Sequence, residues 1–188
     1  MEVFLNLGSG NNPLPKPWTN IDKYYYPGTD EYPSTEEMNR ADGNPEDFDW
    51  IKGDFTDLSG WEDNSVDKVN ICHALEHVCY TDAIKTLKEI YRVLKPGGDI
   101  EVEVPDLEKV IIGWQENRFG YDDFLDLVYG GRDNNVYWGG HFCGFVLELL
   151  CSLMENIGFN NITEIDVGFG TSRPEPDRNF RLKGIKCL

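Results

Sequence analysis

Two glycines and one acid near the start of the chain have the types and the order of a nucleoside-binding site. Residues 5–13 read Leu-Asn-Leu-Gly-Ser-Gly-Asn-Asn-Pro, so a buried strand runs directly into a turn at Gly8 and Gly10. Glycine in such a turn lets the backbone approach a ligand closely. Asp22 ends the next strand-like stretch, where a carboxylate can accept hydrogen bonds from two ribose hydroxyls. The pattern predicts a cofactor that contains a nucleoside, against the alternative of a turn that serves only the fold.

The cofactor that this turn predicts has no pyrophosphate. A dinucleotide fingerprint would place a third glycine at position 13, where the chain has Pro13, followed by Pro15 and Pro17. Proline there also prevents a long helix from starting cleanly. No Gly-Lys-Ser or Gly-Lys-Thr occurs, so a phosphate-binding P-loop is absent. An oxidoreductase of the NAD type is therefore disfavoured.

The elements that must position these residues alternate between strand and helix. A first strand is expected to start at residues 3–5, and a second strand to end at residues 20–22. Further strands are expected at 50–55, 66–72 and 99–105, the last with one wetter face. Helices are expected at 82–94, 106–117 and 145–157, with a short one near 34–40. An acidic, loop-rich segment is expected after residue 117 and up to residue 140. Two closing strands, at 161–167 and 180–188, have no helix between them.

This order predicts an α/β fold with a mostly parallel sheet and an antiparallel C-terminal hairpin. At 188 residues, we expect a single domain over residues 1–188 with a substantial core.

The strong acidity of the chain bears on its partners. It has 34 acidic against 17 basic residues, a formal net charge of −17. Such a field repels nucleic acid and anionic membranes, so we expect neither as a partner. The simplest explanation of the acidity is that the acidic residues form a well-solvated surface that keeps the protein in solution.

Cysteine use and hydropathy predict a cytoplasmic protein. The five cysteines are scattered and include no Cys-x-x-Cys pair, which argues for reduced thiols rather than disulfides or a zinc knuckle. We also expect no signal peptide and no membrane-spanning segment, because no apolar run is long enough.

Several segments, in order, resemble the class I S-adenosylmethionine-dependent methyltransferases, in particular a compact, type 11-like branch. They are listed here: Leu7-Gly8-Ser9-Gly10, Asp22, Gly53-Asp54-Phe55, His73-Ala74-Leu75-Glu76-His77-Val78, Tyr91-Arg92-Val93-Leu94-Lys95-Pro96-Gly97-Gly98 and Val104-Pro105-Asp106-Leu107. The resemblance covers nearly the whole chain. It implies a Rossmann-like, seven-stranded sheet with S-adenosyl-L-methionine across the carboxyl ends of the first strands.

The resemblance also implies roles for residues of the cofactor site. Leu7, Gly8, Ser9 and Gly10 would approach the methionine part, with Asn6 in place of the acid that often contacts its ammonium group. Asp22 would bind the ribose. Asp54 would accept a hydrogen bond from the adenine amino group, and Phe55 would border the ring. The backbone at His73 and Ala74 would face the sulfonium. Because proline follows Gly10, the usual first helix is expected to be shortened or replaced by a loop.

Three residues are candidate proton acceptors, because a hydroxyl acceptor benefits from a general base. His141 lies in an aromatic, glycine-flanked segment, Asp106 follows a strand, and His77 follows His73 by four residues. Each also has a purely structural alternative, such as capping a helix or shaping the pocket floor. We expect no metal site, because no acid or cysteine is placed to complete a ligand set with the histidines. The aromatic residues Tyr129, Tyr137, Trp138 and Phe142 would form an acceptor platform or a packing cluster.

The predicted activity is S-adenosylmethionine-dependent O- or N-methylation of a small molecule or saccharide. The alternative is a noncatalytic nucleoside- or partner-binding protein that retains the fold, which Asn6 and the missing helix favour.

Overall fold

The architecture is that of a single twisted sheet with helices against it, in a computed structural model that describes residues 2–10, 12–23, 45–130, 140–168 and 177–187. The strands are β1 (Phe4–Leu7), β2 (Trp18–Asp22), β3 (Asp49–Lys52), β4 (Val66–Cys72), β5 (Leu94–Pro105), β6 (Phe159–Ile165) and β7 (Asn179–Lys186). The helices are α2 (Tyr80–Val93), α3 (Leu107–Gln115), α4 (Tyr121–Tyr129) and α5 (Leu147–Ile157). The helix predicted near residues 34–40 lies outside the described residues.

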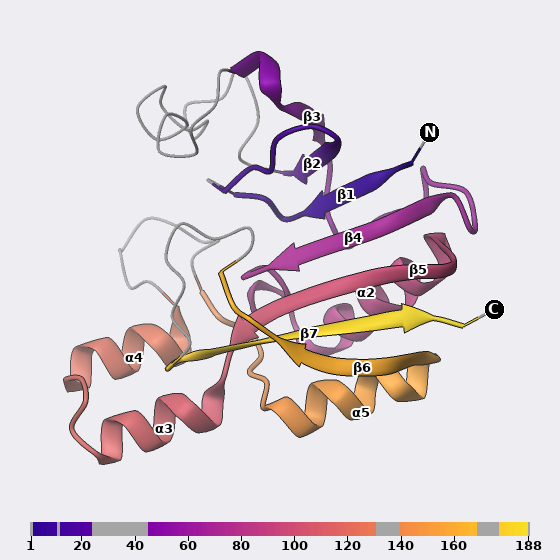
Figure 1. Cartoon of the computed structure of the whole chain (residues 1–188). Helices are drawn as coiled ribbons and strands as arrows, with labels where there is room; N and C mark the ends of the chain where they lie inside the picture. Colours follow the sequence, from indigo (N-terminus) through magenta and orange to yellow (C-terminus); the bar gives the residue numbers. More distant parts are fainter. Residues whose placement is uncertain (1, 11, 24–44, 131–139, 169–176, 188) are drawn as a thin grey trace.

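The seven strands form one sheet in the order β3-β2-β1-β4-β5-β7-β6 (Figure 1). Strands β1 to β5 run parallel, and β7 is antiparallel to both β5 and β6. The prediction of a Rossmann-like, mostly parallel sheet with an antiparallel C-terminal hairpin is confirmed. In this order β1 and β4 are neighbours while the chain crosses over between them, and open α/β sheets bind their ligands beyond the carboxyl ends of the strands at such a point.

One face of the sheet packs against α2 and α5, which also contact each other. The register places Leu5, Val69 and Ile100 side by side, then Leu7, Ile71 and Val102, and all six are fully buried. The apolar positions Ala83, Leu87 and Ile90 face them from α2, spaced three or four residues apart as a helix requires. This layer is the hydrophobic core.

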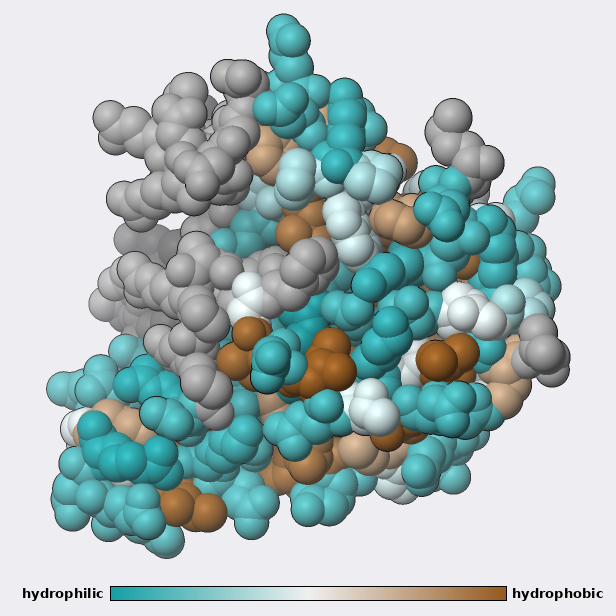
Figure 2. Space-filling view, viewed as in Figure 1, coloured by the Kyte–Doolittle hydropathy of each residue, from teal (hydrophilic) through white to brown (hydrophobic). Residues whose placement is uncertain are grey.

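The opposite face of the sheet is polar. Lys68 and Asp99 are neighbours in the register, and so are Asn6, Asn70 and Glu101; Phe4, beside Lys68, is the apolar exception. Hydrophilic residues accordingly predominate over the strands in Figure 2. Acids and apolar residues alternate along β5 as predicted, but the expected wetter face is not found, because Glu101 and Glu103 are buried in ion pairs with Arg181.

A row of buried hydrogen bonds crosses this polar face. Asn6 donates to Asn20 on β2 (2.9 Å) and accepts from Asn70 on β4 (2.7 Å). Asn70 in turn accepts from the fully buried Arg181 on β7 (2.8 Å). Arg181 pairs with Glu101 (2.5 Å) and Glu103 (3.2 Å) on β5. The row joins five strands through side chains alone.

A loop replaces the helix that would follow β1. The described residues between Gly10 and β2 contain no helix, and Leu14 of this loop is buried against the sheet. Asn20 holds it there, accepting from the Leu14 amide (2.8 Å) and donating to the Leu14 carbonyl (2.9 Å). The predicted loss of the first helix is confirmed.

Helix α4 corrects the sequence-based expectation of a loop before residue 140. Its N-terminal turn carries Asp122 and Asp123, and it has no buried residue, so its pattern looked like solvated loop. Acids are nonetheless favourable at a helix N-terminus, where the backbone dipole is positive. Phe124 stacks on Trp114 of α3, with ring centroids 4.7 Å apart, which anchors α4 to its neighbour.

Candidate functional site

The glycine turn after β1 brings the ends of three strands together. Gly8 has φ +62°, a left-handed conformation that favours glycine, and its amide donates to the Ile21 carbonyl (2.8 Å). A Cβ at this position would lie 2.6 Å from Cβ of Ala74 and 3.4 Å from the ring of Phe55. Phe55 follows β3 and Ala74 follows β4. Gly8, Phe55 and Ala74, predicted from the sequence as parts of one site, are therefore in contact.

Asp22, at the end of β2, locks this turn. Its Oδ2 accepts a hydrogen bond from the Gly10 amide (2.9 Å), and its side chain is almost completely buried. Gly10 also has a positive φ (+51°), and an added Cβ would meet nothing within 4 Å. The carboxylate predicted to bind a ribose therefore lies directly beside the open side of the turn. Its contact with a ribose stays a prediction.

Ser9 supplies a direct sign that this turn accommodates a ligand. Its hydroxyl is buried and has no hydrogen-bond partner among the described residues. An unsatisfied buried hydroxyl costs free energy, about 1–3 kcal/mol, unless a bound molecule or water satisfies it. The residues at the turn thus fit a polar ligand, as the resemblance to cofactor-binding turns implies.

Asp54 lies beyond β3 and is partly exposed. Its Oδ1 accepts from the Thr56 amide (3.0 Å) and hydroxyl (2.7 Å), and its Oδ2 pairs with Lys23 (3.1 Å). Partial burial raises its pKa, but these hydrogen bonds outweigh that effect and leave the pKa below its ordinary value. Asp54 is therefore a carboxylate, the form that could accept a hydrogen bond from an adenine amino group.

The side chain of Asn6 is hydrogen-bonded to neighbouring strands, and not placed for the cofactor contact that the sequence suggested. Both ends of its amide are hydrogen-bonded within the buried row across the sheet, to Asn20 and Asn70. We therefore correct the expectation that its side chain contacts the methionine ammonium. Leu7 is fully buried in the core, so only its backbone is available to a ligand.

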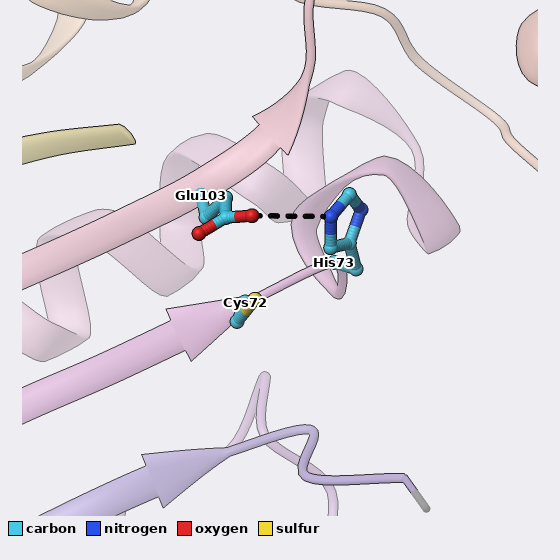
Figure 3. A group of neighbouring side chains, drawn as sticks. All are labelled: Cys72, His73 and Glu103. Carbon is cyan, nitrogen blue, oxygen red and sulfur yellow. Dashed lines mark ion pairs between the residues drawn. The ribbon is translucent and has the colours of Figure 1, made fainter. Parts of the chain in front are cut away.

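His73, the residue after β4, is held between two carboxylates. Its ring faces Glu103 of β5, with Nε2 3.5 Å from Oε1 (Figure 3), and Nδ1 lies 3.2 Å from Oε1 of Glu76. Burial alone would lower its pKa, but the two carboxylates raise it to about 10. His73 is therefore an imidazolium at neutral pH. It adopts φ +49°, unusual for a residue with a side chain, and its amide donates to the Glu103 carbonyl (2.9 Å).

Cys72 completes the group drawn in Figure 3, where its side chain lies at the end of β4. Together with His73 and Glu103 it offers three ligand-type atoms within 4.8 Å of one another. Burial and the nearby Glu103, however, raise the pKa of its thiol far above the ordinary value, which disfavours the thiolate that a metal requires.

A second group of ligand-type atoms corrects the expectation that no acid is placed beside the histidines. One atom each from Glu76, His77 and His141 lie within 4.8 Å of one another. The two histidine rings meet edge to face, 5.0 Å apart between centroids. Glu76 is buried and stays ionised, because its hydrogen bond to His73 and the neighbouring histidines outweigh the effect of burial and lower its pKa.

Glu76 is the site residue that reasoning from the sequence missed. Glu76 lies in the 3₁₀ turn Leu75–His77, directly before His77 and three residues after His73. The carboxylate could have been found from that spacing alone. The approach of His141 could not, because it depends on packing between distant segments.

A pocket opens beside this group. Its lining combines polar and sulfur-bearing residues with an apolar wall: Glu76, Pro105, Leu107, Val110, Leu127, Val128, His141, Cys143 and Gly144. The main-chain amide of Phe142 donates to the Glu76 carbonyl (2.8 Å), which ties the segment of His141 to the end of β4. Burial lowers the pKa of His141, so its imidazole is neutral at pH 7.

Asp106, the third predicted proton acceptor, caps α3. Its Oδ1 accepts from the amides of Glu108 (3.0 Å) and Lys109 (3.3 Å), and its side chain is buried. The structural role that the sequence offered as an alternative is present. Of the predicted aromatic platform, Tyr129 and Phe142 are exposed, and Tyr137 and Trp138 lie outside the described residues.

Comparison with known proteins identifies this arrangement. Residues 5–102, half of the chain, match the family described as "Methyltransferase domain". The demethylmenaquinone methyltransferase of Lactobacillus johnsonii is 33% identical over 116 residues, which cover 58% of this chain and 47% of that protein. A ubiquinone/menaquinone biosynthesis C-methyltransferase of Brucella canis is 45% identical over 60 residues, covering 29% and 22%. The matched part spans half or less of these curated relatives.

The fold agrees with that of solved methyltransferase structures. The crystal structure of a SAM-dependent methyltransferase from Archaeoglobus fulgidus superposes with a TM-score of 0.60 at 15% identity, covering 98% of this chain and 86% of that one. At this identity the likeness concerns the fold alone.

Among the described helices, none combines the length and the apolar character that a membrane crossing demands.

Proposed function

Because this chain belongs to the methyltransferase domain family, we propose that it transfers a methyl group from S-adenosyl-L-methionine to a small-molecule or saccharide acceptor. The observation that carries the proposal is the turn at Gly8 and Gly10, where Asp22 is hydrogen-bonded to the turn and the buried hydroxyl of Ser9 has no partner among the described residues. These groups occupy the carboxyl ends of β1 and β2, the place where open α/β sheets bind their ligands.

The cofactor would supply an activated methyl group on a sulfonium. The chain would hold it through the backbone of Leu7, Gly8, Ser9 and Gly10, with Asp22 at the ribose. Asp54 and Phe55 would bind and border the adenine. The backbone of His73 and Ala74 would lie near the sulfonium, because Ala74 packs directly against Gly8. Methyl transfer by displacement depends mainly on holding donor and acceptor in line.

The acceptor would occupy the pocket beside Glu76 and His141. Glu76 lines this pocket and follows Ala74 by only two residues, which would bring the acceptor near the cofactor site. Its wall of Leu107, Val110, Leu127 and Val128 suits a compact molecule with an apolar part, and its polar end suits a hydroxyl or an amine. The proposed reaction is O- or N-methylation.

The proton of the acceptor would be handled at the group of Glu76, His77 and His141. His141 lines the pocket and is neutral at pH 7, which makes it the first of the three predicted proton acceptors. His77 touches its ring. Asp106 is the weakest of the three, because its Oδ1 already accepts two backbone hydrogen bonds.

We further propose that residues 1–188 act as one domain, in the cytoplasm, on an acceptor that is neither nucleic acid nor a membrane. The formal charge of −17 supports the exclusion of nucleic acid and of anionic membranes, since both would be repelled. One curated relative is named a demethylmenaquinone methyltransferase and the other a C-methyltransferase of ubiquinone/menaquinone biosynthesis, so a quinol belongs among the acceptors tested.

The test of this function has two stages. Calorimetry first measures binding of S-adenosylmethionine and S-adenosylhomocysteine. Release of S-adenosylhomocysteine is then followed with a panel of amines, phenols, sugars and quinols, in the parent and in His141→Asn. We expect cofactor binding in both proteins, and turnover reduced by roughly 10²–10⁴-fold in the variant, the usual contribution of acid–base catalysis.

Two other results would change the proposal. Failure to bind either cofactor form would refute it. Binding without turnover on any acceptor class would favour the noncatalytic alternative, a nucleoside-binding protein that retains the fold.

A further inference from the structure

Glu76, His77 and His141 together have the composition of a metal site. Two imidazoles and one carboxylate, each offering one ligand atom, lie within 4.8 Å of one another at the wall of the acceptor pocket. We propose that these three side chains bind one divalent cation of the zinc type. Two histidines and a glutamate are a known ligand set for catalytic zinc, which takes three protein ligands and keeps a fourth position open.

The hydrogen bonds of the two histidines leave the same nitrogen for a metal. Nδ1 of His77 lies 3.1 Å from the Gly140 carbonyl, and Nδ1 of His141 lies 3.1 Å from the Leu127 carbonyl. A carbonyl oxygen only accepts, so each Nδ1 carries the proton and donates it. In the neutral ring, Nε2 then has a lone pair. Metal-binding histidines are typically oriented in this way, by a hydrogen bond from the other nitrogen to a carbonyl or carboxylate.

Glu76 supplies an independent observation that points to a cation. Its side chain is only 2% exposed, and its Oε2 is buried without a hydrogen-bond partner among the described residues. An ionised oxygen sealed from water and left unpaired is costly, and a buried charge is normally paired or bound to a metal. Nε2 of His77 lies 4.0 Å from Oε1, and one ligand atom of each of the three residues lies within 4.8 Å of the others, so small side-chain shifts suffice to close the group around an ion.

The surroundings of Glu76 are those of a supported ligand. Its other oxygen, Oε1, is hydrogen-bonded to Nδ1 of His73 (3.2 Å), whose Nε2 faces Glu103 (3.5 Å). Glu103 pairs in turn with the buried Arg181 (3.2 Å). Ligating carboxylates are generally held by such outer hydrogen bonds. The chain from Arg181 to Glu76 therefore fixes one ligand in place while leaving Oε2 for the ion.

The neighbouring group of Cys72, His73 and Glu103 (Figure 3) meets only one of these conditions, since Oε1 of Glu103 is also buried without a hydrogen-bond partner among the described residues. Both ring nitrogens of His73 already face carboxylates, and Glu103 accepts from Arg181 and from the Gly168 amide. Nε2 of His73 also lies 3.1 Å from Nδ2 of Asn179, so both ring nitrogens already have polar neighbours. Cys72 consequently provides a matched control for the experiment below.

The position of the cation gives it a catalytic consequence, and only this consequence rests on the proposed function. An acceptor hydroxyl or amine in the pocket would reach the open position of the ion. A bound cation lowers the pKa of such a group, so the acceptor would lose its proton more readily before methyl transfer. His141 would then act as a ligand, and turnover would depend on the metal.

The test is direct binding of Co²⁺, which replaces zinc and reports its geometry by visible absorption. The whole chain, first treated with EDTA and then dialysed, is titrated with CoCl₂ and, in competition, with ZnCl₂. We expect one equivalent of Co²⁺ with the intense absorption of a four-coordinate site, displaced by Zn²⁺. Glu76→Gln, His77→Gln and His141→Gln should each weaken binding at least 100-fold. Cys72→Ser should bind as the parent does.

Circular dichroism of the metal-free variants checks that each one is folded, and Glu76→Gln keeps the shape of the side chain if a histidine variant fails that check. No stoichiometric binding to the parent, or binding that Cys72→Ser abolishes and Glu76→Gln leaves intact, would overturn the proposal. Because this readout requires neither cofactor nor acceptor, its failure is distinguishable from failure of the methyltransferase function.

Discussion

At the scale of single residues, the candidate cofactor site depends on two glycines that have different reasons to be glycine. Both Gly8 and Gly10 have a positive φ. Only Gly8 also lacks room, because Ala74 occupies the space where a Cβ would lie. Asp22 then fastens the turn through the Gly10 amide. The turn is therefore preorganised, and its open side lies at Gly10.

The two glycines give a matched pair of variants. Gly10→Ala should cost about 1–2 kcal/mol of the free energy of unfolding, the cost of a side chain in the left-handed region. Gly8→Ala should cost about 1–3 kcal/mol more, because its Cβ would overlap Ala74. Urea denaturation measures both. The excess at Gly8 should shrink in an Ala74→Gly background; equal losses at the two positions would contradict the packing explanation.

Asp22 gives the sharpest test of cofactor recognition. Asp22→Ala should weaken binding of S-adenosylmethionine by about 1.5–3 kcal/mol, the range for hydrogen bonds to a charged group. Asp22→Asn is the control, since an amide oxygen still accepts from the Gly10 amide but has no charge, and it should show a smaller loss. Calorimetry measures both affinities. Unchanged affinity in Asp22→Ala would rule out the ribose contact.

At the scale of elements, the buried row from Asn20 to Arg181 connects the parallel strands with the C-terminal hairpin through side chains. Arg181 reaches from β7 to β4 and β5, pairing with Glu101 and Glu103 and donating to Asn70. Glu101 also accepts from Lys68 (2.6 Å). The antiparallel hairpin is thereby joined to the parallel strands through charge as well as through backbone hydrogen bonds.

The contribution of these ion pairs to stability can be measured through the pH dependence of unfolding, because Glu101 titrates. Burial alone would raise its pKa, but Lys68 and Arg181 outweigh that effect and lower it. A depressed carboxyl pKa contributes stability above the unfolded value, about 4.3, and the contribution is lost as pH falls through the folded value. Glu101→Gln should therefore lose about 1.5–3 kcal/mol at pH 7. The difference in the free energy of unfolding between the parent and Glu101→Gln should become smaller below about pH 4.3.

Urea denaturation from pH 7 down to pH 3 tests this expectation. The control is Glu164→Gln on β6, where the side chain is 51% exposed and lies 3.9 Å from Lys109. An exposed pair of this kind is worth about 0–1 kcal/mol. A difference for Glu101→Gln that stayed constant with pH, or that matched the control, would show that the buried charges do not stabilise the hairpin.

At the scale of the whole molecule, the net charge of −17 sets the response to salt. Like charges repel across the folded chain and destabilise the compact state. Raising NaCl from 10 to 150 mM shortens the screening length from about 30 to about 8 Å, so the melting temperature should rise over this interval. The same concentrations of an uncharged solute provide the control. A melting temperature that fell with salt would indicate that favourable ion pairs dominate.

Much of the fold could be predicted from the sequence, because local periodicity encodes which face of an element is buried. The strand at residues 66–72 appears with the predicted bounds, and most other strands and helices begin or end within a few residues of expectation. The acids and valines of β5 alternate because one face packs on α2 and the other meets charged neighbours. Gly8, Asp22 and Ala74 could be grouped because their motif segments resemble those of a known family. Helix α4 was missed, since it buries no residue and has no clear apolar stripe.

What only the tertiary structure decided concerns contacts between distant segments. The amide of Asn6 looked available to a cofactor, and the register with β2 and β4 instead places it in a buried row. His77 and His141 are far apart in the chain, and their rings meet because the end of β4 and the segment before α5 pack together. A sequence states which side chains can bind a proton or a metal. Whether they face one another depends on the packing energy of the whole sheet and its helices, which no local pattern contains.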